Sequence, residues 1–509
     1  MRIERTKNAK RNLIWGIANK ILGLVVPFVC RGAIIRIFGM NYLGLSSLFT
    51  SILTALNLAE LGFGSAIVYF MYKAIADDDK AKICALMQYY KKVYREIGIA
   101  ILGMGLLIMP LIPYLIKKDI PADINIYIVY LLTLAGTVVT YFLYAYKNSI
   151  LVAFQRSDVA SKVSSVVLLG ERILQLFCIV VLHNYYYYLA VTVLMNAVNN
   201  IVTAKYADKL YPEYNAAGNL ADGERKEIHK KITGLFWYKI GNIVLGSADS
   251  IVISAFLGLV ISGIYGNYYY VISTLFSFLA IYYSSFRAGL GNSIAIESVQ
   301  KNYTDFKVLQ LIQTWIISWC SVCLLCLFQD FITLYAGKEN VLSIGLVLSV
   351  CIYFFVWRIQ DIVTVYKEAS GLWDSDRYRP LIGALVNLVL NIITVQFVGL
   401  YGVVFSTVFV LVFIDIPWAS KVLFNDYFKV GRKEYYKLLG HAVLMLLIMA
   451  LPSYGLCMLV PINNHLLSLF VRSLICLIIP NLVFIFANRN TAEFASAVSR
   501  VKYILQTKG

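Results

Sequence analysis

Residues 13–38 read LIWGIANKILGLVVPFVCRGAIIRIF and follow a tail rich in Lys and Arg. An α-helix needs about 20 apolar residues to cross a bilayer, so this stretch is long enough to span one. A signal peptide would have a shorter apolar run and a cleavage site with small residues, which this stretch lacks. The sequence therefore predicts that residues 13–38 remain in the protein as its first transmembrane helix.

Similar apolar stretches continue along the chain, separated by short polar connections. Their predicted bounds are 43–72, 97–116, 124–146, 159–182, 186–206, 233–257, 262–286, 308–335, 342–366, 380–399, 402–424, 438–460 and 466–487. The composition agrees, because 60% of the 509 residues are hydrophobic and 14% are charged, which is outside the balance of soluble proteins. We therefore expect an all-α integral membrane protein with about fourteen transmembrane helices.

Basic residues alternate between the loops. Most of the 45 Lys and Arg residues fall in the two tails and in the segments 73–95, 147–162, 205–239, 287–307, 367–379 and 421–437, whereas only Lys117, Lys118 and Lys338 fall in the loops between. Because loops that retain Lys and Arg face the cytoplasm, the pattern predicts a multi-pass protein with both termini inside. The dispersal of the charge, despite a net +17, argues against a nucleic-acid partner.

Glycines indicate two related halves. Gly39 and Gly44 flank the connection between the first two spans, and Gly258 and Gly263 flank the corresponding connection in the second half, at a constant shift in numbering. Many transporters are built from such repeats around a central site. We expect two six-helix lobes around a central cavity, followed by two extra helices. The predicted bounds are 1–206 for the N-lobe, 207–232 for a cytoplasmic linker, 233–425 for the C-lobe and 426–509 for the last two spans and the tail.

Both halves also resemble a known family. The motifs that carry the resemblance are Ile35–Gly39, Tyr42–Leu45, Glu60–Gly62, Ala66–Tyr72 and Asp77–Tyr94 in the first half, and Asp249–Ser254, Phe256–Gly258, Gly263–Tyr265, Asn267–Tyr268 and Leu290–Asn292 in the second. They are similar to those of the bacterial polysaccharide exporters of the MOP (MATE-like) superfamily, the lipid-linked oligosaccharide flippases of O-antigen and capsule assembly. The resemblance implies a bacterial inner (plasma) membrane and alternating access by rocking of the lobes. Arg287 departs from the family pattern, which has a small or polar residue there.

Ionisable side chains inside the spans are the strongest functional candidates. Each costs about 2.5–3.5 kcal/mol to insert at mid-span, so each is expected to face a wet cavity or a partner. Lys20 and Arg31 share one face of the first span, about 16 Å apart along its axis, with Pro27 between them. We interpret this face as a cationic stripe of the cavity, and Arg36 and Arg472, near helix ends, as snorkelling residues.

Acidic residues in the spans are candidates for coupling or gating. Glu60 and Glu171 belong to polar stripes of spans two and five, and Glu171 and its neighbour Arg172 are expected to address different partners. Asp249 lies at a depth similar to that of Arg31 in the opposite half. We hypothesise that these two residues pair in one conformation, the alternative being packing within each half.

The tenth and eighth spans supply further candidates. Arg358 and Asp361 are i, i+3 neighbours, so they form either a self-neutralising pair or, alternatively, a contact to substrate. Tyr269 and Tyr283 belong to an aromatic stripe, which serves either packing and the interface or the stacking of sugar rings. The predicted cavity residues are thus Lys20, Arg31, Arg172, Arg287, Arg358, Tyr269 and Tyr283, and the predicted coupling or gating residues are Glu60, Glu171, Asp249 and Asp361.

We predict no catalytic residue, cofactor or metal ligand. Cys320, Cys323 and Cys326 recur at helical spacing. A structural zinc site, however, has four nitrogen or sulfur ligands, and no His is near in the sequence. We therefore interpret these cysteines as small apolar packing residues. A membrane glycan polymerase or acyltransferase would need a large outer loop or a His within the membrane, so we expect that the protein is not an enzyme.

The favoured hypothesis is a flippase for a polyprenyl-pyrophosphate-linked oligosaccharide, in which interior cations replace water around the phosphates. The main alternative is a cation-coupled multidrug exporter of the same superfamily, which would use Glu60, Glu171 or Asp249 for its ion. The surplus of interior cations favours an anionic substrate. Expected partners are the lipid-linked oligosaccharide, membrane lipids, a coupling ion (proton or sodium), and glycosyltransferases and a polymerase working beside the protein.

Overall fold

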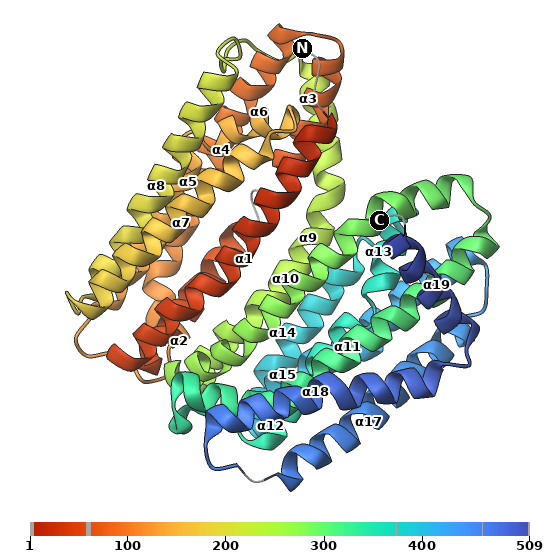
Figure 1. Cartoon of the computed structure of the whole chain (residues 1–509). Coiled ribbons are helices and arrows are strands. Elements are labelled where there is room, and N and C mark those ends of the chain that lie inside the picture. Colours follow the sequence, from red (N-terminus) through yellow and green to blue (C-terminus); the bar gives the residue numbers. More distant parts are fainter. Residues whose placement is uncertain (1–4, 58–62, 373, 461, 507–509) are drawn as a thin grey trace. The chain divides into compact units, whose positions relative to one another are not determined.

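The computed structural model describes residues 5–57, 63–372, 374–460 and 462–506. These residues form helices joined by short connections, and no β-strand occurs among them. Helices are expected here because an apolar segment in lipid must satisfy every backbone polar group within itself. The chain divides into two compact units, Met1–Gly263 and Ile264–Gly509. Figure 1 shows the helices of both units in sequence colours.

The first unit is a bundle of long helices. Its elements are α1 (Arg5–Ile37), α2 (Met40–Leu56), α3 (Phe63–Ala76), α4 (Lys80–Ile108), the 3₁₀ turn η2 (Met109–Leu115), α5 (Ile126–Phe142), η3 (Ala145–Lys147), α6 (Asn148–Ala153), α7 (Ser157–Val180), α8 (Tyr185–Leu210), α9 (Asp222–Leu257) and the first residues of α10 (Leu259–Ile296). Within this unit α7 packs against both α1 and α8, and α5 packs against α8 (Figure 1).

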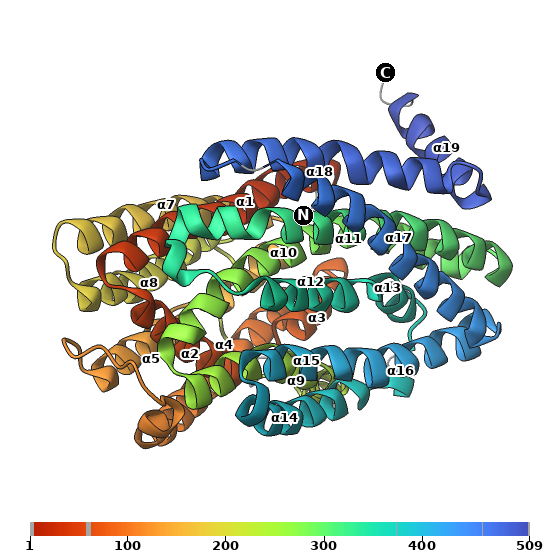
Figure 2. The ribbon, with the colours of Figure 1, turned by 90° about the horizontal axis from the view of Figure 1, so that it is seen from below.

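The second unit contains the remainder of α10 and all later helices. These are α11 (Val299–Ala336), η4 (Lys338–Asn340), α12 (Ile344–Arg358), α13 (Asp361–Ala369), η5 (Asp374–Asp376), α14 (Arg379–Val398), α15 (Leu400–Val410), the π-helical η6 (Leu411–Asp415), α16 (Ile416–Lys421), η7 (Val422–Phe428), α17 (Arg432–Leu459), α18 (His465–Asn488) and α19 (Ala492–Gln506). Figure 2 shows the two late helices α17 and α18 alongside α11, and the contacts confirm that both pack on it.

The expectation of a multi-helix membrane protein is confirmed. Among the described residues, ten helices are long and apolar enough to cross a membrane, or twelve if each of two bent pairs, Ile126–Phe142 with Ala145–Ala153 and Leu259–Ser284 with Gly289–Ile296, is one span. The other two predicted spans, 43–72 and 233–257, fall on the shorter apolar helices Met40–Leu56, Ala66–Ala76 and Ile243–Leu257.

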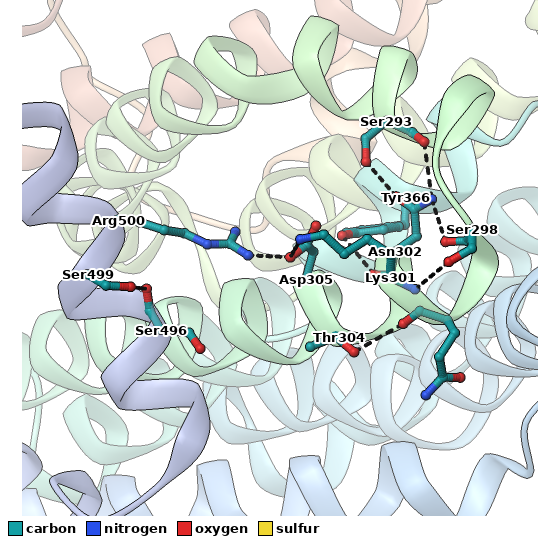
Figure 3. Close-up of polar contacts among 11 residues, drawn as sticks. Ser293, Ser298, Lys301, Asn302, Thr304, Asp305, Tyr366, Ser496, Ser499 and Arg500 are labelled. Atoms are coloured by element: carbon teal, nitrogen blue, oxygen red, sulfur yellow. Dashed lines mark hydrogen bonds and ion pairs between the residues drawn. The ribbon is translucent and has the colours of Figure 1, made fainter. Parts of the chain in front are cut away.

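Several segments predicted as basic loops are helical extensions of the spans. α4 already begins at Lys80, where the Asp79 side chain caps it by accepting a hydrogen bond from the Lys82 amide at 2.9 Å. α11 likewise begins at Val299, capped by Ser298, whose side chain accepts from the Lys301 amide. Figure 3 shows this helix start, and also Arg500 of α19 bonded to Asp305 of α11. The charged residues of these segments therefore sit on ordered helices.

The two glycine hairpins have the same backbone geometry. Gly39 has φ 102° and ψ 173°, and Gly258, at the matching position of the second half, has φ 102° and ψ 171°. Residues with a Cβ atom rarely adopt this conformation, so the two positions require glycine. The same unusual geometry at matching positions supports the predicted internal repeat.

The boundary between the two compact units falls at a different residue from the predicted lobe boundaries. The predicted N-lobe ends at residue 206 and its linker at 232, whereas the first unit runs to Gly263. The reason is that α9 packs against α2 and η2 of the first unit. The Lys117 amide also donates to the Ser254 carbonyl at 3.1 Å. The lobe bounds 1–206, 207–232, 233–425 and 426–509 all stay predictions.

Candidate functional site

The first unit contains a cavity of about 870 Å³ lined by both apolar and uncharged polar side chains. Its walls come from α1, α3, α4, η3, α6, α7 and α8. The polar residues that line it are Asn19, Tyr69, Tyr72, Tyr90, Tyr94, Asn148, Ser149, Ser161, Ser164, Asn199, Asn200 and Thr203, and no charged residue is among the described residues that line it. Ligand pockets commonly have this size, so the cavity could hold a small polar group.

Hydrogen bonds within the walls fix some of these side chains and leave others available. The Tyr90 hydroxyl donates to the Tyr94 hydroxyl at 2.7 Å, and the Asn200 amide donates to the Thr140 carbonyl at 3.0 Å. The buried amide oxygen of Asn199 has no hydrogen-bond partner among the described residues. Since a buried acceptor is costly without a donor, Asn199 favours a bound group that can donate to it.

A second cluster in the first unit joins three of the predicted residues. The Arg172 guanidinium lies 3.7 Å from the Glu171 carboxylate and also donates to the Gln175 side chain. Arg31 of α1 and Arg172 of α7 both lie within electrostatic range of the Tyr188 phenol of α8. Two cations therefore lie near one tyrosine, and Glu171 lies beside one of them.

The expectation that Glu171 and Arg172 address different partners is wrong. Their Cα–Cβ bonds diverge around the helix, but the long Arg172 side chain folds back toward Glu171. Gln175, one turn further along α7, links the pair because its amide donates to Glu171 at 3.2 Å and to Thr192 at 2.8 Å. The polar stripe of span five thus ties α7 to α8.

A third cluster gathers predicted residues of the second unit. Arg358 and Asp361 form the i, i+3 ion pair at 3.3 Å, as one of the two interpretations of the sequence expects. The Tyr283 hydroxyl donates to Gln313 at 2.6 Å, and the Gln313 amide donates to the Arg358 carbonyl. The Arg358 guanidinium also lies 4.1 Å from the centroid of the Phe276 ring. Arg358 and Asp361 thus neutralise each other within this cluster.

The other predicted residues lie outside these clusters. Arg287 is half exposed and pairs with Glu368 at 3.2 Å, and Tyr269 stacks on Tyr265 with 6.1 Å between ring centroids. Lys20 is exposed on α1, and Asp249 is buried in α9. Glu60 lies outside the described residues. The roles proposed for all eleven residues, including an Arg31–Asp249 pair, stay predictions.

Comparisons with known proteins agree on the fold. No protein-family model and no curated protein matches the sequence. A structure of the lipid II flippase MurJ in an inward closed conformation is similar, with a TM-score of 0.66 and 16% identity over 94% of this chain and 98% of that one. The chain has the fold of the MOP-superfamily transporters.

Two further solved structures are also similar to this chain in fold. An inward-facing multidrug resistance MATE family transporter of the MOP superfamily gives a TM-score of 0.60, with 12% identity over 83% of this chain and 96% of the other. A MOP superfamily transporter from Pyrococcus furiosus, described as having a binding pocket of reverse polarity, gives 0.53, with 14% identity over 81% and 95%. At these identities the likeness establishes the MOP fold alone.

The outer surface of this MOP fold carries an apolar groove between α7 and α8. It has a volume of about 740 Å³ and is lined by Val163, Val166, Val167, Gly170, Met195, Val198 and Val202, with Arg156, Lys162 and Lys209 also on its wall. α7 begins at Ser157 and α8 ends at Leu210, and the two helices pack together, so these three cations gather at one end. The groove thus pairs an apolar channel with a basic end.

Most of the uncharged residues that line the cavity were not predicted from the sequence. Asn199 and Asn200 interrupt an apolar run, which was an available signal, but uncharged amides are a weaker functional signal than charges. Asn148 lies in the segment 147–162, which was predicted as a basic loop. The convergence of these three residues from α6 and α8 depends on tertiary packing. The arginines that the sequence did single out lie in ion pairs or beside tyrosines.

Proposed function

We propose that this protein is a flippase that moves a polyprenyl-pyrophosphate-linked oligosaccharide from the cytoplasmic to the outer leaflet by alternating access, for cell-surface polysaccharide assembly. The observation that carries the proposal is the cavity of about 870 Å³ with amide, hydroxyl and phenol groups and no charged residue among its described walls. Sugar hydroxyls both donate and accept hydrogen bonds, as do these side chains. An uncharged pocket with these groups therefore suits the neutral sugar part of the substrate.

The cluster of Arg31 and Arg172 supplies the complementary charge. A pyrophosphate leaving water needs donors with positive charge, and guanidinium groups provide several donors in a fixed plane. Glu171 contacts Arg172, and both arginines lie within electrostatic range of the Tyr188 phenol. We assign the phosphates to this cluster.

The groove between α7 and α8 supports a substrate with a lipid chain. Its valine-rich lining is compatible with a hydrocarbon chain, and Arg156, Lys162 and Lys209 suit an anionic headgroup. Asp158 is buried among Arg11, Arg156 and Lys162, so the cations outnumber the acid there. A lipid could approach along this face before its headgroup enters the cavity.

The multidrug exporter remains the second candidate, because one similar structure is described as a multidrug resistance MATE transporter. A pump for cationic drugs needs carboxylates at its binding site. The cavity has no carboxylate among its described lining residues, and Glu171 already contacts Arg172. These two observations favour the flippase.

The cellular setting follows from the same proposal. We place the protein in a bacterial inner membrane with both termini in the cytoplasm, on the distribution of Lys and Arg. It would act beside glycosyltransferases and a polymerase, as a transporter and not an enzyme, with a proton or sodium ion as coupling ion. Genes for those enzymes beside its own gene would agree with this role.

A reconstituted vesicle assay tests the proposal. Flipping of a labelled polyprenyl-pyrophosphate-linked oligosaccharide would be followed by its accessibility to a reagent outside the vesicle. Ser164→Phe places a ring into the cavity, and we expect it to reduce flipping at least about tenfold. Ile173→Phe adds the same ring to an exposed position on the same helix and should leave the rate near that of the unmodified protein.

Two results would count against this proposal. One is equal flipping by both variants, which would contradict the role of the cavity in transport, though not the flipping activity itself. The other is efflux of a cationic dye, in an ion gradient, that Ser164→Phe abolishes while the unmodified protein flips no labelled glycan. That second result would establish the multidrug exporter instead.

A further inference from the structure

Three helices of the second unit bring cysteine side chains together. Cys326 of α11, Cys457 of α17 and Cys476 of α18 have their sulfur atoms within 4.8 Å of one another. All three side chains are buried, with exposed fractions of 2%, 0% and 1%. These residues are far apart in the chain, so only the tertiary fold assembles them.

A fourth cysteine adjoins this group. Cys323 lies one helical turn before Cys326, in the motif Cys323-Leu324-Leu325-Cys326. Its thiol is within hydrogen-bonding reach of the Cys476 thiol. The sequence alone indicated packing roles for Cys323 and Cys326, because a zinc site has four nitrogen or sulfur ligands and no His is near in the sequence. The structure supplies the two that were missing, Cys457 and Cys476.

The four cysteines lie in apolar surroundings. The cysteines share a hydrophobic cluster with Leu311, Val322, Met445, Met449 and Phe484. No disulfide joins any of the nine cysteines, so all four sulfur atoms are thiols. Arg472 lies one turn before Cys476 on α18 and within electrostatic range of both Cys457 and Cys476.

The spacing suits a metal ion. A tetrahedral zinc site has Zn–S bonds of about 2.3 Å, which places its sulfur atoms about 3.8 Å apart. The sulfur atoms of Cys326, Cys457 and Cys476 already lie within 4.8 Å of one another, so they need only small side-chain shifts to reach that spacing. Thiolate sulfur selects Zn²⁺ and Cu⁺ over harder ions such as Mg²⁺ and Ca²⁺.

We propose that Cys323, Cys326, Cys457 and Cys476 form a buried thiolate site for a thiophilic metal ion, Zn²⁺ or Cu⁺, that fastens α17 and α18 to α11. On binding, each ligating thiol releases its proton, so the site loads at neutral or higher pH and empties in acid. Since the site lies apart from the residues assigned to transport, its role is structural, and its test does not depend on the proposed function.

Metal analysis of the full-length protein tests the site directly. The protein would be purified in detergent without chelators, and zinc and copper would be measured by inductively coupled plasma mass spectrometry. We expect about one ion per chain, with zinc and copper told apart by mass. Cys326→Ser should lower the metal content at least about fivefold. Cys351→Ser, at a buried cysteine of α12 that belongs to no such group among the described residues, should leave it unchanged.

A second measurement covers the case in which Cys326→Ser does not fold. Unmodified protein treated with a membrane-permeant chelator should lose its ion and melt several degrees lower, and adding Zn²⁺ or Cu⁺ back should restore the melting temperature. Metal below the level of the detergent blank, with no change on adding either ion, would overturn the proposal. A disulfide between any two of these four cysteines, detected by mass spectrometry of peptides from unreduced protein, would also overturn it.

Discussion

Gly44 lies so close to Leu259 that a Cβ atom added at Gly44 would come well within 3.0 Å of the Leu259 carbonyl oxygen. The reciprocal contact also exists, since a Cβ atom at Gly263 would collide in the same way with the Met40 carbonyl oxygen. One constant shift in numbering relates Gly44 to Gly263 and Met40 to Leu259. The two contacts are therefore symmetric halves of one helix crossing within the first unit, as an internal repeat requires.

Substitution of either glycine should separate the two backbones. We expect Gly44→Ala and Gly263→Ala each to destabilise the fold by about 1–3 kcal/mol, because the obstructing atoms are backbone and cannot rotate away. Thermal unfolding in detergent, followed by circular dichroism, measures the loss. Gly23→Ala in α1 is the control, since nothing lies within 4 Å of its added Cβ atom. Equal melting temperatures for all three variants would show that the helices cross more loosely.

The repeat illustrates what local sequence can predict. The glycines at 39, 44, 258 and 263 stand in short apolar hairpins, so their spacing alone indicated the repeat. Apolar length likewise predicted the helices, because a span is a local property of about 20 residues. The ion pair of Arg358 with Asp361 was also predictable, since i, i+3 neighbours meet on any helix.

Features that depend on packing between distant helices were not predictable in this way. The cavity is formed by uncharged residues, such as Asn199, whose polarity is modest and whose neighbours come from several other elements. The four-cysteine group joins α11 to α17 and α18, which follow it only much later in the chain. The direction of the Arg172 side chain was missed for a different reason, because a flexible side chain overrides the angle set by its Cα–Cβ bond.

A buried charge network in the second unit gives a test of stability. Asp376 pairs with both Lys367 and Arg379, and Arg379 also pairs with Asp415 at 2.9 Å. All four residues have exposed fractions of 5% or less, and their charges cancel. Asp376→Asn leaves one cation in excess, so we expect a loss of about 3–5 kcal/mol in unfolding free energy.

A double variant distinguishes the effect of net charge on stability from the effect of lost contacts. Lys367→Met with Asp376→Asn keeps the Arg379–Asp415 pair and restores neutrality, so it should be more stable than Asp376→Asn alone. Glu434→Gln, which breaks only the exposed pair with Lys437, should change stability by less than about 1 kcal/mol. A double variant less stable than the single one would show that the network acts through its hydrogen bonds, not its net charge.

Two arginines of α1, Arg31 and Arg36, provide a test residue and a matched control for the transport proposal. Arg31 is half-buried and lies near the Tyr185 and Tyr188 phenols, whereas Arg36, little more than one turn later, is exposed. If Arg31 binds the pyrophosphate, Arg31→Ala should reduce flipping of the lipid-linked glycan about tenfold or more, and Arg31→Lys should retain part of the activity. Arg36→Ala should flip at the unmodified rate in the same vesicles. Equal rates for the Arg31 and Arg36 variants would remove α1 from phosphate binding.

The junction of α1 with α7 depends on Asp158. Its side chain is fully buried and contacts Arg11 at 3.5 Å, Arg156 at 2.9 Å and Lys162 at 3.5 Å. The Asp158 amide also donates to the Asn12 side chain at 2.7 Å, so α1 is attached at both the backbone and the carboxylate. Because Asp158→Asn leaves three cations around a neutral group, we expect it to lower the melting temperature and to loosen α1.

Hydrogen exchange resolves where the loosening occurs. Amides of α1 near Asn12 should exchange faster in Asp158→Asn than in the unmodified protein, while those of α17 and α18 stay unchanged. Asp208→Asn removes the partner of Lys147, but Asp208 is half exposed, so that variant should leave α1 protected. Uniformly faster exchange throughout the first unit would mean that Asp158 supports the whole bundle, because a local attachment would release only α1 and the start of α7.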